Sequence, residues 1–232
     1  MSGFPGGVAI TDLAVYDTAA ADGCVGGSPH AHTASSEAYV VTAGSGAVQT
    51  LSSDGFAEHR LAPGDVLWFE PGTVHRLVND GDLRLLVIMS NAGLPEAGDA
   101  VLTFPTHVLS DPDAYRAAAE LPDGPDRERA VHARRDLAVE GFQALKAGGP
   151  AALAHFHAQA ALLVRPHVER WQQIWEKSVA APAEQTWRQL AALAEGEVGA
   201  LAAASVTRLT ATGGDRTWGM CGRLQTWEGA VR

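Results

Sequence analysis

Three histidines and one glutamate have the types and spacing of a metal site. His30 and His32 are two residues apart, and in a strand such side chains project from one face about 7 Å apart, so both imidazoles can reach one ion. Glu37 is an odd number of residues beyond His32, so we expect residues 33–36 to turn the chain and let Glu37 open the next strand facing inward. His75, well separated in sequence, offers a fourth ligand.

Three imidazoles and one carboxylate form a borderline-to-hard ligand set. This set suits a divalent transition metal, namely Fe, Mn, Ni, Cu or Zn, and leaves one or two positions for water or substrate. Tyr39 follows Glu37 by two residues and shares its inward face, so it is a candidate catalytic residue that could donate a hydrogen bond to a bound substrate. Trp68 is a second candidate for the substrate pocket.

The spacing of these residues resembles the two sequence motifs of the cupin superfamily. The first motif is His-x-His followed by Glu and Gly, and it is matched by His30, His32, Glu37 and Gly44. The second motif contains two glycines, His and Asn, and it is matched by Gly64, Gly72, His75 and Asn79. Cys24 and Glu70 depart from the motifs, where a glycine and a proline are expected. The resemblance implies a small jelly-roll antiparallel β-barrel with the metal near one end of its lumen.

The elements that would position these ligands are short β-rich runs separated by turn residues, which is typical of a barrel. We expect a mainly β domain over residues 1–108. Its glycine-containing segments at 44–46 and 53–55 look like hairpin turns, and 79–82 looks like a further turn. No helix-length segment separates the runs, so the sheet should be antiparallel.

After residue 110 the composition changes to Ala, Leu, Glu and Arg with apolar residues at helical spacing. We expect a helical extension over residues 109–204, interrupted near 148–150 and at Pro166. Residues 205–232 should form a tail in which 206–212 and 217–227 could be strands. The long apolar stripes of the helices need burial, either against the barrel or in a homodimer.

The charge distribution limits the partners. Residues 1–108 hold 12 acidic and 3 basic side chains of a chain with net charge −10, which argues against nucleic acid as a partner. No stretch approaches the ~20 apolar residues of a membrane span, so we expect no membrane partner. The N-terminal residues carry no secretion signal, which favours a cytoplasmic location.

We expect a metal-dependent enzyme that acts on a small organic molecule. An oxygen-dependent oxidoreductase of the dioxygenase type is favoured, because few bases besides His59 and Glu70 accompany the ligands in the barrel segment. The alternatives are a metal-dependent isomerase or epimerase, and a non-catalytic module that binds a small ligand and signals through its helices.

Overall fold

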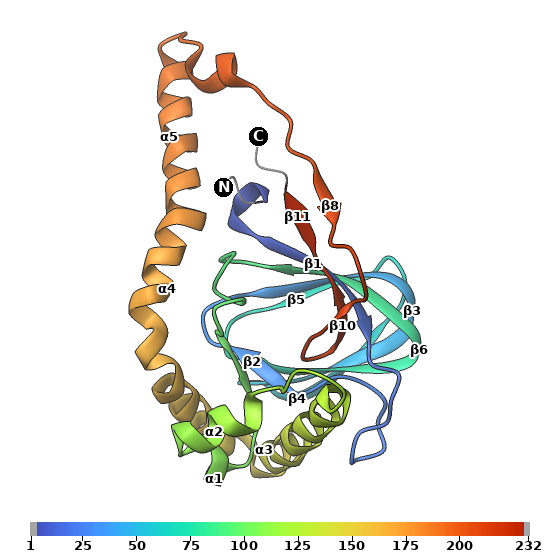
Figure 1. The fold of residues 1–232 in the computed structure, drawn as a ribbon. Coiled ribbons are helices and arrows are strands. Elements are labelled where there is room, and N and C mark those ends of the chain that lie inside the picture. The colour runs from blue at the N-terminus through green and yellow to red at the C-terminus, as the bar shows by residue number, and fades with distance from the viewer. Residues whose placement is uncertain (1–3, 230–232) are drawn as a thin grey trace.

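The protein is described by a computed structural model that covers residues 4–229. Nine strands form one antiparallel sheet that curves into a barrel (Figure 1). These strands are β1 (Ala9–Val15), β2 (His30–His32), β3 (Glu37–Ser52), β4 (Gly55–Leu61), β5 (Val66–Phe69), β6 (Val74–Met89), β7 (Ala100–Leu102), β9 (Thr217–Trp218) and β10 (Gly222–Gln225). The expected antiparallel β-barrel is confirmed.

Two long strands organise the barrel. β3 and β6 pair along their whole lengths, from Glu37 opposite Met89 to Leu51 opposite Val74. The first half of β3 also pairs with β5, and its second half pairs with β4. β2 lies between β6 and β7, with His30 directly opposite His75.

The expected turns at 44–46 and 79–82 are wrong, because β3 and β6 each run through them without reversing. The register shifts between Val41 and Gly46 instead, so these glycines mark a bulge that bends the long strand. Gly44 has a φ of 73°, and a Cβ atom there would lie 2.2 Å from the carbonyl oxygen of Asp82. The positive φ of this glycine allows the strand to bend, and because hairpin turns need the same conformation, the sequence alone predicts a turn here. The turn at 53–55 does join β3 to β4.

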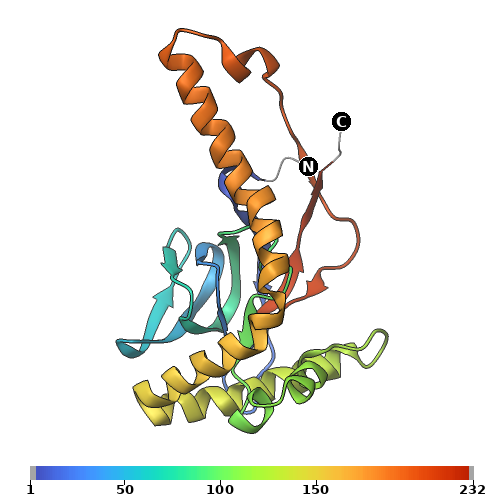
Figure 2. The ribbon, with the colours of Figure 1, turned by 90° about the vertical axis from the view of Figure 1, so that its left-hand side faces the viewer.

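The helical extension follows the barrel strands, as expected. It contains α1 (Thr106–Leu109), α2 (Pro112–Ala119), α3 (Arg127–Val164), a 3₁₀ turn η2 (Arg165–His167), α4 (Val168–Trp175), a π-helical turn η3 (Glu176–Ala180) and α5 (Ala181–Ala194). Gly149 has a non-helical φ of 64° inside α3, and there the chain reverses direction (Figure 2). Pro166 separates α3 from α4, as its missing amide hydrogen predicts.

The tail returns to the barrel. β10 pairs with β1 from Asp12 opposite Gln225 to Val15 opposite Gly222, so it extends the same sheet. A separate two-stranded sheet joins β8 (Leu209–Ala211) to β11 (Trp227–Gly229), while two short 3₁₀ turns, η1 and η4, cover Pro5–Gly7 and Gly199–Ala203. The expected strand at 206–212 contains β8, but the expected single strand at 217–227 is wrong, because residues 219–221 turn the chain and β9 pairs with β10.

Two apolar cores hold the molecule together. One fills the barrel interior and includes Tyr39, Leu77 and Leu85, all fully buried. The other joins the outer face of the sheet to the helices, where Val74 and Leu102 pack with helical residues such as Phe142. Helices α1, α2 and α3 lie against the outside of the barrel, and the chain then rises through α4 to α5, which projects beyond the strands (Figures 1 and 2).

The far part of the extension has little to pack against. Trp187 and Leu190 on α5 are 73% and 55% exposed, and Leu193 is 47% exposed. None of the helices among residues 4–229 is long and apolar enough to cross a membrane.

Candidate metal centre

The four residues expected to bind a metal converge inside the barrel. His30 and His32 come from β2, Glu37 opens β3, and His75 lies near the start of β6. One potential ligand atom from each lies within 4.8 Å of all the others, and all four residues are buried. Residues 33–36 turn the chain between β2 and β3, as the inward placement of Glu37 requires.

Hydrogen bonds fix the tautomers of two of these histidines. Nδ1 of His30 lies 2.9 Å from the carbonyl oxygen of Ser28, and Nδ1 of His75 lies 3.1 Å from that of Thr73. A carbonyl oxygen only accepts, so in each neutral ring Nδ1 carries the proton and Nε2 carries a lone pair. The two Nε2 atoms face each other at 3.1 Å.

His32 is held by a carboxylate. Its Nδ1 lies 2.6 Å from Oδ1 of Asp99, a fully buried residue, so its Nε2 is also directed into the cluster. That Nε2 lies 3.3 Å from Oε2 of Glu37, and Nε2 of His75 lies 3.0 Å from the same oxygen. Outer carboxylate partners of this kind orient metal-binding imidazoles and strengthen their basicity.

This arrangement fits a divalent cation. Nε2 lone pairs and a carboxylate oxygen repel one another at about 3 Å unless a positive charge lies among them. Glu37 Oε2 is buried and has no hydrogen-bond partner among the described residues, as expected of an atom that binds a cation. Nitrogen and oxygen donors in this ratio suit a first-row transition metal or zinc.

The electrostatics of the ligands agree with that assignment. Burial, followed by the neighbouring His75 and His32, holds the pKa of His30 well below its usual range, so this ring stays neutral. Burial raises the pKa of Glu37, but the adjacent His75 and His32 outweigh it and bring that pKa well below its usual range. Burial lowers the pKa of His32, but Asp99 and Glu37 together raise it to about 10, so this ring holds a proton that a metal would displace.

Tyr39 lies close to the cluster, inside the barrel. Its ring packs edge-on against Phe69, which in turn lies 4.3 Å from the His75 ring. The Tyr39 hydroxyl is buried without a hydrogen-bond partner among the described residues. Burial, with the nearby Glu37 carboxylate, raises the pKa of Tyr39 well above its usual range, so the phenol keeps its proton and can act as a donor.

Trp68 is not part of this arrangement, which corrects its expected place in the pocket. Residues alternate along β5, so Phe69 faces the lumen and Trp68 faces outward, with 66% of its surface exposed. His59 and Glu70 are also exposed, His59 next to Thr50 and Glu70 accepting a hydrogen bond from Ser36. Neither supplies a base inside the barrel.

Asp99 is the residue that sequence reasoning missed. It lies 67 residues beyond His32 and outside both motifs, and it reaches His32 because β7 pairs with β2. An acidic residue directly before the apolar run 100–102 was a weak sign of a buried carboxylate, but the sequence did not reveal which strands pair.

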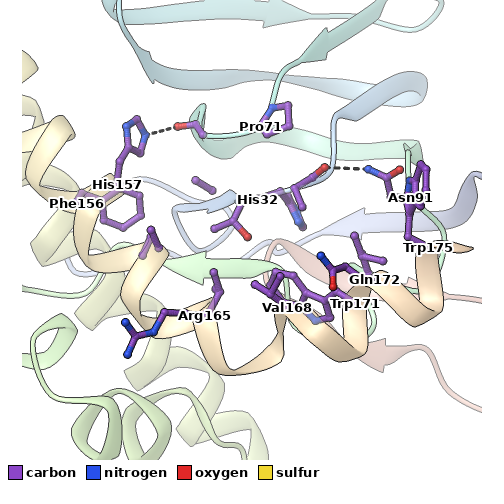
Figure 3. A pocket seen from close by; sticks show the side chains of 18 residues that line it. His32, Pro71, Asn91, Phe156, His157, Arg165, Val168, Trp171, Gln172 and Trp175 are labelled. Atoms are coloured by element: carbon purple, nitrogen blue, oxygen red, sulfur yellow. Dashed lines mark hydrogen bonds between the residues drawn. The ribbon is translucent and has the colours of Figure 1, made fainter.

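A cavity of about 810 Å³ adjoins the cluster. It lies between the turn that follows β2, the turn at Pro71-Gly72, and helices α3 and α4 (Figure 3). His32 belongs both to its wall and to the metal cluster. The sequence did not connect the helices with this site.

Residues 20–89 match the cupin domain model. No curated protein matches the chain. Among solved structures, the chain is similar to the nucleoside dehydratase Pac13 of Streptomyces, with 15% identity over 43% of this chain and 70% of that one and a TM-score of 0.33. It is similar to a Bacteroides fragilis cupin protein, with 24% identity over 37% and 65% of the two chains and a TM-score of 0.28. It also resembles the TDP-quinovose 3,4-ketoisomerase WlaRB of Campylobacter jejuni, with 18% identity over 34% and 60% of the chains and a TM-score of 0.29.

Proposed function

We propose, from the cupin domain at residues 20–89 and the histidine–glutamate cluster within it, that the protein is a metal-dependent enzyme acting on a small organic molecule. The observation that carries the proposal is the convergence of three imidazole Nε2 atoms and one unpartnered carboxylate oxygen in a buried space. Such a cluster is costly to build unless a cation balances it.

A bound divalent metal would supply Lewis-acid polarisation of a substrate oxygen, and a redox-active one would also supply electron transfer to O₂. His30, His32 and His75 would hold the ion, and Glu37 would offset one of its charges. The unpartnered hydroxyl of Tyr39 would donate a hydrogen bond to a substrate atom and so orient it.

Within this class we favour an oxygen-dependent oxidoreductase of the dioxygenase type. An isomerase or epimerase needs a base that removes a substrate proton. Inside the described barrel Asp99 is engaged with His32, and burial raises the pKa of both Tyr39 and Cys221, so none of these three groups is a ready base. O₂ chemistry at a metal does not require such a base.

Elemental analysis combined with O₂ uptake tests the assignment. Protein purified without metal-affinity steps should contain iron, manganese, nickel or copper, and should consume O₂ with a member of a panel of diols, thiols and enols. Zinc as the resident metal, with no O₂ consumption, would overturn the oxidoreductase and favour an isomerase or a ligand sensor.

Replacement of one ligand tests the metal centre itself. His75→Ala should lose metal binding, because the ion loses one of its four protein donors. His155→Ala is the matched control, since His155 is exposed on α3 and should leave the metal content unchanged. Full metal occupancy of the His75→Ala protein, measured by elemental analysis, would contradict the role of His75.

A further inference from the structure

The cavity beside His32 has walls from both parts of the chain. Ala31–Ala34 and Pro71-Gly72 line it from the barrel, and residues of α3, η2 and α4 line it from the extension (Figure 3). Its volume of about 810 Å³ is suitable for a small organic molecule. The helical extension therefore completes a space that the barrel alone leaves open.

The helical wall is apolar. Phe156 and Val164 from α3, with Val168, Trp171 and Trp175 from α4, face the cavity. The 3₁₀ turn at Pro166 changes the helix direction between these groups, so both helices reach the same space. Trp171 is anchored by a hydrogen bond from its indole nitrogen to the carbonyl oxygen of Ala97, which makes this wall rigid.

The polar groups on the wall are mostly engaged within the protein. Asn91 donates to the carbonyl oxygen of Ala34, and His157 lies 2.7 Å from that of Gly72 (Figure 3). The guanidinium group of Arg165 extends away from His32 (Figure 3). No cation in the described wall therefore faces the metal ligand, which disfavours phosphorylated or strongly anionic substrates.

We infer that this cavity binds the substrate of the metal centre, and that the substrate has an apolar, preferably aromatic, body that packs on α4 and an oxygen-donor group directed past His32 to the metal. The inference rests on the proposed function and assigns its substrate class. Val168 and Trp175 become specificity-determining residues, because they supply apolar contact without touching the ligand set.

Two hydroxamates test the inference on the full chain loaded with Co(II), with binding followed by visible absorbance. Benzohydroxamate and acetohydroxamate have the same chelating group and differ in the ring that would occupy the cavity. The ring should tighten binding about tenfold, which corresponds to about 1.4 kcal/mol, because it removes apolar surface from water in the cavity. A Val168→Asp substitution should bring the ratio of the two affinities close to one, because a charged side chain replaces the apolar contact with the ring.

Leu162→Asp is the matched control. Leu162 is 63% exposed on α3 and does not line the cavity, so the same charge there should leave the ratio of the two affinities unchanged. Trp175→Ala provides a second cavity variant if Val168→Asp is poorly folded. Trp175 is 42% exposed in the wild-type protein. A reduced ratio of benzohydroxamate to acetohydroxamate affinity in the Trp175→Ala protein also supports the inference.

The outcomes distinguish a failure of the substrate assignment from a failure of the proposed metal-dependent function. Equal affinity for both hydroxamates, or an unchanged ratio in both cavity variants, overturns the substrate assignment while the metal centre stands. A wild-type protein that does not retain Co(II) overturns the proposed function itself. Retained Co(II) that binds neither hydroxamate overturns the inference, because the metal is then closed to ligands from the cavity.

Discussion

His32 has a hydrogen-bond partner on each side of its ring. Asp99 holds Nδ1 at 2.6 Å, and Nε2 is thereby directed to the cluster, 3.3 Å from Glu37. His30 and His75 are instead held by backbone carbonyl groups, whose positions depend on the strands themselves. His32 is the one ligand whose tautomer depends on a side chain that can be replaced.

Asp99→Asn should therefore weaken metal binding about 10- to 100-fold, because the amide no longer enforces the proton on Nδ1. Asp54→Asn, on an exposed turn between β3 and β4, is the control. Competition with a chelator of known affinity measures the change. An Asp99→Asn protein with wild-type metal affinity would show that the strand alone positions His32.

The sequence predicted residues whose spacing is local and missed those whose contacts are distant. Two-residue alternation placed His30 and His32 correctly, and the turn expected at residues 33–36 placed Glu37. His75 was a candidate as a histidine just after the Pro71-Gly72 turn, and the resemblance to the cupin motifs supported it. Asp99 could not be placed, because its contact with His32 arises from the pairing of β7 with β2.

An ion pair between a buried arginine and a partly exposed aspartate ties the segment before β2 to the barrel. Arg76 on β6 is fully buried, and its guanidinium contacts both carboxylate oxygens of Asp22, at 2.5 and 3.0 Å. The fold thereby fixes the approach of the chain to β2. Burial raises the pKa of Asp22, but the hydrogen bonds and charge of Arg76 outweigh it and lower that pKa below its usual 3.8.

Asp22→Asn should lower the free energy of unfolding by about 2 kcal/mol at neutral pH, because the buried Arg76 would remain charged beside a neutral partner. The native carboxylate stabilises the fold above pH 3.8, and this contribution is lost as the pH falls through the lower pKa of the folded state. The difference between wild type and variant should therefore narrow in acid. Urea unfolding of both proteins at several pH values measures this difference in the free energy of unfolding.

Asp113→Asn is the control for that experiment. Asp113 pairs with Arg116 on the surface of α2, with both side chains largely exposed, so its loss should leave unfolding almost unchanged. A difference between the Asp22→Asn protein and wild type that stays constant from neutral pH to below pH 3 would contradict the role of the charged carboxylate.

At the level of elements, the strand and helix types were predictable and their connections were not. The glycine at 44 and the segment 79–82 looked like turns, although β3 and β6 bend there as continuous strands. A glycine with positive φ serves a hairpin and a bulge equally well, so composition could not distinguish them. Pro166 gave a correct prediction because its effect on a helix is local.

At the scale of the whole molecule, we propose that the exposed face of α5 is covered in a homodimer. Trp187, Leu190 and Leu193 are exposed apolar residues of α5, the helix that projects away from the barrel (Figure 2). Exposed apolar residues of this kind in an otherwise charged protein mark interaction surfaces. The apolar periodicity was visible in the sequence, but the absence of a partner within the described chain was not.

Light scattering after size-exclusion chromatography should give the mass of a dimer for the wild type. A Trp187→Asp, Leu190→Asp double variant should be monomeric, because two buried charges oppose association, and it should retain its metal. Leu162→Asp, exposed elsewhere on the extension, should stay dimeric. A wild-type monomer at micromolar concentration would contradict the dimer.

The pairing of β1 with β10 has a consequence for biosynthesis. Arg216, just before β9, contacts Asp12 on β1, 204 residues earlier, so the ribosome makes the entire helical extension before this contact can form. Until then the nascent chain presents one edge of β1 as unpaired backbone, a surface that invites pairing with other chains. Closure of such distant contacts is slow. Nascent chains stalled before β10 should therefore be strong clients of ribosome-associated chaperones.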